Sequence, residues 1–76
     1  MLIGKMFRMH TQVLGIEPID ARTGAVLVPA RAVVRVTADP SPLDERMVEL
    51  LWEERVVMVF RMDVLERAAE VQTRAV

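Results

Sequence analysis

The 76-residue sequence contains no cysteine, which excludes disulfide bonds, thiolate metal ligands and thiol nucleophiles. A chain without cysteine suits a reducing compartment, so we expect a cytoplasmic protein. No apolar run approaches the ~18 residues of a membrane span, and the first residues lack the apolar stretch of a signal peptide. We therefore expect no membrane among its partners.

Residue types that carry chemistry are also scarce. His10 is the single histidine, and no His-x-x-x-His or Glu-x-x-His spacing occurs, so a transition-metal site is not expected. The three glycines are isolated, which excludes a glycine-rich loop for nucleotide phosphates. Ser41 stands between two prolines, typical of a turn or a cap rather than a nucleophile. We predict no catalytic residue, no cofactor and no enzyme activity; an enzyme whose site forms only between subunits is the alternative.

Only three aromatic residues are present, namely Phe7, Trp52 and Phe60. Small barrels that bind nucleic acids stack bases on exposed aromatic rings beside basic groups. Here all three aromatics fall on the apolar faces of their predicted strands. We therefore assign them to the core.

Apolar residues, by contrast, make up 53% of this short chain. A chain of this length forms a single small domain, 1–76, with a small core. Apolar residues in excess of that core predict a homo-oligomer or a protein partner.

The charge is small overall and uneven along the sequence. The net charge is −1, so the whole chain offers no basic footprint for nucleic acid. Residues 1–38 carry five basic and two acidic residues, a net +3, whereas residues 39–76 carry −4. Folding either interleaves the halves and cancels the asymmetry or leaves complementary faces for association.

Alternating and β-branched segments predict a mainly β fold. Residues 5–13 alternate with a period of two, and residues 25–28, 32–37 and 56–60 are rich in valine. Gly15 and Pro18 interrupt the first strand, and residues 19–24 are typical of a turn. Residues 39–42, Asp-Pro-Ser-Pro, form the clearest loop.

The segment 42–52 allows two structures. Leu43, Met47, Leu50 and Leu51 follow helical spacing behind a possible Ser41 cap, which predicts an extra helix and an α+β fold. The same segment also alternates as a strand that would pair with residues 56–60. After it, Asp63-Val64-Leu65-Glu66 has the form of a capping box and predicts a short C-terminal helix. The apolar stripe of this helix, about two turns long, is formed by Val64, Leu65, Ala68 and Val71.

A resemblance favours the strand. The run from Leu51 to Arg67, together with Val28-Pro29-Ala30-Arg31-Ala32-Val33-Val34, resembles a group of small uncharacterised bacterial proteins with an SH3-like barrel pattern. In that group a tight turn follows the tryptophan, and an acidic residue after Met-Phe starts a short helix. Glu54 and Arg31 stand where the group has glycine, which weakens the assignment of tight turns at both places. The resemblance implies an SH3-like barrel of about five short antiparallel strands with a short C-terminal helix, and no function follows from it.

We interpret the chain as a noncatalytic binding or interaction module that self-associates. Its contact surface is expected on a strand edge or on an outward strand face. The residues that we assign to this surface are Met6, Arg8, His10, Arg31, Arg35 and Met47. The alternative is a small RNA- or DNA-binding barrel that uses the arginines of the first half, namely Arg8, Arg22, Arg31 and Arg35.

Overall fold

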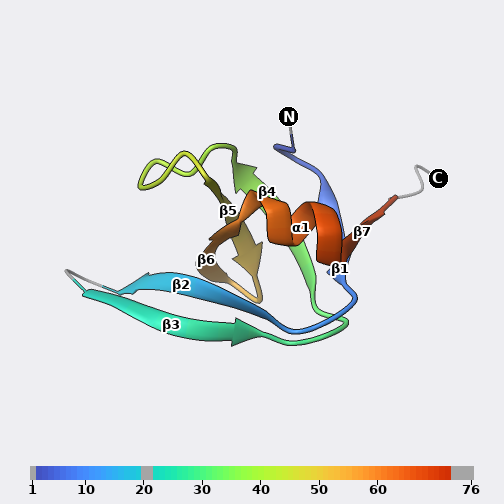
Figure 1. Ribbon diagram of the computed structural model, residues 1–76, viewed down its shortest axis with the longest axis horizontal. Helices are drawn as coiled ribbons and strands as arrows, with labels where there is room; N and C mark the ends of the chain where they lie inside the picture. Colours follow the sequence, from blue (N-terminus) through green and yellow to red (C-terminus); the bar gives the residue numbers. More distant parts are fainter. Residues whose placement is uncertain (1, 20–21, 73–76) are drawn as a thin grey trace.

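The structure of the chain, a computed structural model, describes residues 2–19 and 22–72 (Figure 1). The described elements are, in chain order, β1 (Met6–Met9), β2 (Val13–Ile19), β3 (Arg22–Val28), β4 (Val33–Ala38), β5 (Met47–Trp52), β6 (Arg55–Phe60), α1 (Arg61–Arg67) and β7 (Ala68–Val71). The strands form one sheet in the order β3-β2-β6-β5-β4-β1-β7, and every neighbouring pair is antiparallel. The mainly β prediction is confirmed.

The number of strands and the barrel differ from the prediction. Seven strands are described rather than about five, and the two outer strands, β3 and β7, do not pair with each other. The described sheet is therefore open, and a five-stranded barrel is not confirmed. The β2–β3 hairpin extends along one side of the molecule, and α1 lies between the β5–β6 hairpin and β1 (Figure 1). Of the described helices, none has the length and the apolar character needed to cross a membrane.

The main core covers one face of the sheet, which we call the inner face. Alternation places every second residue of each strand on this face, as Phe7 and Met9 show on β1 and Val34 and Val36 on β4. Val64 is the buried residue of α1 and closes the core from the helix side. The buried residues of this cluster are Phe7, Met9, Val13, Val28, Val34, Val36, Val48, Leu50, Trp52, Val57, Val59 and Val64.

At one end of the core, the Arg55 side chain covers the ring of Trp52. Trp52 is only 9% exposed, and the Arg55 guanidinium lies 5.1 Å from the centre of its ring. Two nitrogens of Arg55 also donate hydrogen bonds to the carboxylate of Glu17, at 2.9 and 2.6 Å. These bonds hold the pKa of Glu17 below its ordinary value. The prediction that Trp52 belongs to the core is confirmed.

A second, smaller buried group lies on the opposite, outer face. The register pairs Met47 with Phe60 and Glu49 with Met58, so Met47 and Met58 point away from the main core. Both are nevertheless buried, and the loop of residues 39–46 bonds to the Met47 backbone and contacts the Met58 side chain. The Ser41 hydroxyl lies 2.9 Å from the sulfur of Met58, and the Ser41 N–H donates to the Met47 carbonyl. Phe60 itself is 45% exposed, so the prediction that it belongs to the core is wrong.

The alternative helix over 42–52 is wrong. Residues 41–46 form turns with one isolated bridge between Ser41 and Asp44, and β5 begins at Met47. Six register pairs from Met47–Phe60 to Trp52–Arg55 satisfy the backbone of this segment within the sheet. Tertiary pairing therefore overrides the helical spacing of its leucines.

Tight turns form at both places where glycine was expected but absent. Glu53 and Glu54 connect β5 and β6 with φ of 48° and 66°, and Arg31, just before β4, has φ of 72°. A two-residue hairpin with two left-handed residues matches the twist of its strands. Side chains in this region cost about 1–2 kcal/mol per residue, so the flanking strands and their contacts impose the turns on an unfavourable sequence.

The C-terminal part contains a shorter helix than predicted, and a strand that was not predicted. The helix begins at Arg61, its N-cap is Phe60, and no side chain caps it; Asp63 lies inside the first turn, so the capping-box prediction is wrong. Ala68 then resumes an extended backbone, and β7 pairs with all four residues of β1. Val71, predicted on a helical stripe, thus lies on this strand.

The predicted first strand is interrupted after Met9, because other segments form hydrogen bonds with its backbone there. The Met9 N–H donates to Ala32 and its carbonyl accepts from Arg31, while the His10 N–H donates to Arg67. β1 therefore ends at Met9, and β2 starts at Val13. Gly15 and Pro18 lie within β2 rather than interrupting it, because Pro18 pairs with Thr23 at a point where β2 has no pairing with β6.

Candidate interaction surface

The predicted surface is formed by outward residues of β1 and β4. Phe7 and Met9 point into the core, so Met6 and Arg8 of β1 lie on the outer face. On β4 the buried Val34 and Val36 leave Val33 and Arg35 outward. The register pairs Met6 with Arg35 and Arg8 with Val33, so the two arginines are diagonal neighbours on adjacent strands.

β7 places a second set of residues beside them. Its register pairs Val71 with Met6 and Ala69 with Arg8, so these two residues share the outer face with the arginines. Glu70 lies between them on the strand and is paired with Phe7 in the register. The sequence had no strand signal here, since Ala68-Ala69-Glu70-Val71 contains a single β-branched residue.

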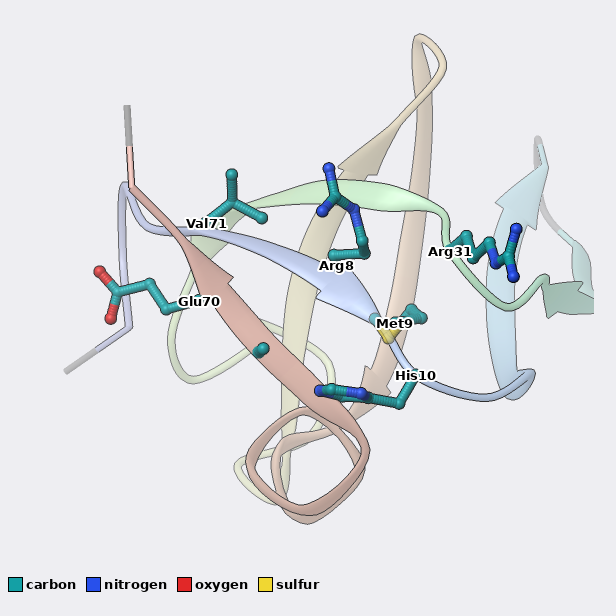
Figure 2. Close-up of a pocket in the computed structure, with 7 residues that line it drawn as sticks. Arg8, Met9, His10, Arg31, Glu70 and Val71 are labelled. Carbon is teal, nitrogen blue, oxygen red and sulfur yellow. The ribbon is translucent and has the colours of Figure 1, made fainter. Parts of the chain in front are cut away.

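Two adjoining hollows flank β7 and share Glu70 and Val71. The first, of about 360 Å³, is lined by residues from β1, from the turn before β4 and from β7, namely Arg8, Met9, His10, Arg31, Ala69, Glu70 and Val71 (Figure 2). The second, of about 430 Å³, is lined by Gly4, Lys5, Met6, Arg35, Glu70, Val71 and Gln72. Figure 2 shows the side chains of Arg8, His10 and Arg31 spread around Met9.

Five of the six predicted surface residues line these hollows. Met6, Arg8, His10, Arg31 and Arg35 are brought together from three segments of the chain. Met47 is not among them: it is 5% exposed, so its assignment to the surface is wrong. The strand alternation placed it on the correct face, but it could not reveal that the side chain is buried there. Lys5 and Glu70 were missed by the sequence analysis.

We define the basic face as Lys5, Arg8, His10, Arg31 and Arg35. Lys5 forms an exposed ion pair with Glu70 at 3.6 Å, and Arg35 donates a weak hydrogen bond to the Met6 sulfur at 3.7 Å. Within residues 2–19 and 22–72, no ion pair involves Arg8, Arg31 or Arg35. These arginines therefore keep their charge available to an external group.

The arginines of the second half behave differently. Those for which the structure gives an ion pair are Arg46 with Asp44, Arg55 with Glu17, Arg61 with Asp39 and Arg67 with Asp63. The hydrogen bonds from Arg46 lower the pKa of Asp44 to about 2. Arg8, Arg31 and Arg35 of the first half thus have no described ion pair, whereas these four arginines of the second half each pair with a carboxylate.

Arg22, the fourth arginine of the nucleic-acid hypothesis, is not brought to this face. It begins β3, and the strand order places four strands between β3 and β1 and five between β3 and β7. Its side chain lies outside the described part of the chain. A continuous track of all four arginines is therefore not formed by the strand arrangement.

The described side chains of this face include three guanidinium groups and one imidazole. His10 is exposed at the end of β1, and its backbone N–H is used by Arg67. Across the described residues, no three histidine, cysteine or acidic side chains come together as metal ligands could. Guanidinium groups recognise carboxylates and phosphates by charge-assisted hydrogen bonds.

Comparisons of the chain with protein-family models, with curated proteins and with solved structures give no match. The resemblance to small SH3-like bacterial proteins therefore stays a prediction.

Proposed function

We propose that the protein is a noncatalytic interaction module that binds an extended acidic segment of a partner protein along β7, with carboxylates of that segment on the basic face. The observation that carries this proposal is the contrast among the described arginines. Arg8, Arg31 and Arg35 line the hollows beside β7 and have no described ion pair, while the ion-paired arginines lie elsewhere.

The edge of β7 supports an extended partner. β7 pairs with β1 on one side and is the outer strand of the described sheet on the other. A free strand edge can bind a peptide as an added strand through main-chain hydrogen bonds. Strands lie ~4.8 Å apart, so the added strand would lie roughly 10 Å from β1.

The small side chains of β7 leave room for acidic residues in the added strand of the partner. Ala69 is the outward residue of β7 that is paired with Arg8. Its methyl group is small, so the Arg8 guanidinium can extend over it toward the added strand. Long acidic and basic side chains together span the gap between the added strand and β1. Alternate positions of the bound segment are therefore suited to carboxylates.

The backbone at Arg31 gives further support. This residue has φ of 72°, a conformation that glycine adopts without strain, and yet a long cationic side chain stands there and lines the first hollow. Strained residues are retained most readily where the side chain has a use. A charge on the basic face is such a use.

The test is a titration of the full chain against a fluorescein-labelled peptide of alternating glutamate and valine, followed by anisotropy. We expect saturable binding that weakens as salt rises, because exposed charges are screened. Arg8→Ala and Arg35→Ala should each weaken binding roughly three- to tenfold. Arg46→Ala removes the same charge from the exposed Asp44 pair and should leave binding unchanged.

Two outcomes of the anisotropy titration would contradict the proposal. A flat anisotropy signal at millimolar protein concentration would remove it, as would equal losses in Arg8→Ala and Arg46→Ala. A lysine–valine peptide of the same length is the charge control and should not bind.

Nucleic acid is the second candidate, supported by the same unpaired arginines. It predicts tighter binding of a short single-stranded oligonucleotide than of the acidic peptide, with a steep dependence on salt. Neither hollow has an aromatic residue in its described lining: Trp52 is buried beside Arg55, and the exposed Phe60 lies beside Arg46. This favours the acidic peptide, because single-stranded nucleic acids are bound by stacking on aromatic rings.

A further inference from the structure

The two outer strands of the sheet differ in length and in charge. β7 has four residues, and its Glu70 forms an ion pair with Lys5 at that end of the sheet. β3 has seven residues, contains no proline, and carries no charge from Thr23 to Val28. Free edges are usually protected by shortness, charge, proline or a bulge. From Thr23 to Val28, β3 has no charge, no proline and no bulge, so this part of its edge can pair with another strand.

The register indicates which residues of β3 offer their backbone to that edge. Pro18 has no N–H, so its pair with Thr23 suits a position where β2 and β3 do not exchange hydrogen bonds. Alternation then turns the N–H and C=O groups of Ala25 and Leu27 toward the free side. β3 is the last strand in the order, so no described strand receives these groups.

Apolar side chains stand beside the same edge. Leu14 and Leu27 are directly paired across β2 and β3, and they are 59% and 52% exposed. Ile16 and Ala25 form the next pair on the same face, two residues along. A strand added to β3 would therefore cover exposed leucine as well as satisfy backbone groups.

We propose that β3 pairs antiparallel with β3 of a second copy of this chain. The two sheets then become one, with Leu14 and Leu27 of both copies covering the junction. A two-fold axis brings each strand against its own sequence, so a charged edge would meet like charge. From Thr23 to Val28, β3 has no charge to repel, and it offers no countercharge to an acidic or basic partner strand. This favours a second copy as the occupant.

The proposed dimer does not use the edge of β7. β3 and β7 lie at opposite ends of the strand order, so pairing through β3 leaves the backbone groups of β7 free. The proposal is thus independent of peptide binding, and either can fail without the other.

The test is sedimentation velocity of the full chain over a range of concentrations. We expect a monomer–dimer equilibrium that Leu27→Lys shifts toward monomer by about tenfold or more, because an ammonium group would enter an apolar junction. Ala25→Pro removes one edge N–H and should act in the same direction. Leu65→Lys is the matched control: Leu65 is 53% exposed on α1, and its substitution should leave the equilibrium unchanged.

Hydrogen exchange tells this dimer from other forms of association. The amides of Ala25 and Leu27 should become protected as concentration rises, while circular dichroism shows that each variant stays folded. A wild-type monomer at every concentration would overturn the proposal. So would a dimer in which these two amides stay unprotected, or in which Leu65→Lys is as disruptive as Leu27→Lys.

Discussion

Gly15 on β2 lies directly against Val57 on β6: a Cβ atom on Gly15 would stand 2.5 Å from Cγ1 of Val57. The same atom would stand 3.1 Å from the Met58 carbonyl oxygen and from Cγ1 of Val59. Val57 and Val59 are fully buried, so neither can move aside without disturbing the core. The missing side chain is what lets the β2–β3 hairpin approach the rest of the sheet.

Gly15→Ala should therefore destabilise the protein by about 1–3 kcal/mol, the usual cost of overpacking a core. The measurement is the free energy of unfolding in urea. Gly24→Ala is the control, because a Cβ there meets nothing closer than 3.9 Å; it should be neutral or slightly stabilising. Equal effects of the two substitutions would show that β2 does not approach β6 as closely as described.

Glu54→Gly should stabilise the β5–β6 hairpin. Glu54 has φ of 66° and is exposed, so the substitution removes strain and no buried contact. We expect a gain of about 1 kcal/mol, after the larger entropy of glycine in the unfolded chain is counted. Glu45→Gly is the same substitution at an exposed loop residue without positive φ and should not stabilise. A loss of stability in Glu54→Gly would contradict the described turn.

Arg31→Gly should raise the stability of the protein and weaken its binding of the acidic peptide. Its φ of 72° predicts a gain of about 1 kcal/mol in urea unfolding, by the argument given for Glu54. The same substitution removes a charge from the first hollow, so affinity for the acidic peptide should fall. Arg31→Ala loses the charge and keeps the strain, and should weaken binding without stabilising. If Arg31→Gly binds the peptide as wild type does, Arg31 has no part in the basic face.

The ion pair between Asp39 and Arg61 should make stability depend on acid pH. Asp39 is nearly buried, and hydrogen bonds from Arg61 and from the Leu2 N–H hold its pKa below the ordinary 3.8. Because the folded pKa is lowered, its contribution is complete above the unfolded value and is lost as pH falls through the folded value. The unfolding free energy should therefore decrease as pH falls below about 4.

The variants Asp39→Asn and Arg61→Gln check this assignment. Each should lower stability at neutral pH by about 1 kcal/mol, since each leaves a partner unpaired. Asp39→Asn should also flatten the decline in acid relative to wild type. A decline as steep in Asp39→Asn as in the wild type would assign the pH dependence to other carboxylates, such as Asp44, whose pKa is about 2.

Much of the strand pattern was predictable because alternation is a local signal. The outward positions of Met6, Arg8 and Arg35 follow directly from the period of two on β1 and β4, and the structure places them so. Their meeting with Arg31 around two hollows was not predictable, because β7 was assigned to a helix. Alternation also placed Met47 on its correct face, but its burial depends on tertiary contacts.

The amino-acid sequence by itself determined a mainly β chain without cysteine, with one histidine and a positive first half, because composition and short-range periodicity act within neighbouring residues. The tertiary structure decided the features that depend on contacts between residues far apart in the sequence. It made residues 47–52 a strand by pairing them with β6, imposed left-handed turns on Glu53, Glu54 and Arg31, and buried Met47. It also left Arg8, Arg31 and Arg35 without described ion pairs, since the positions of the carboxylates are set by the fold.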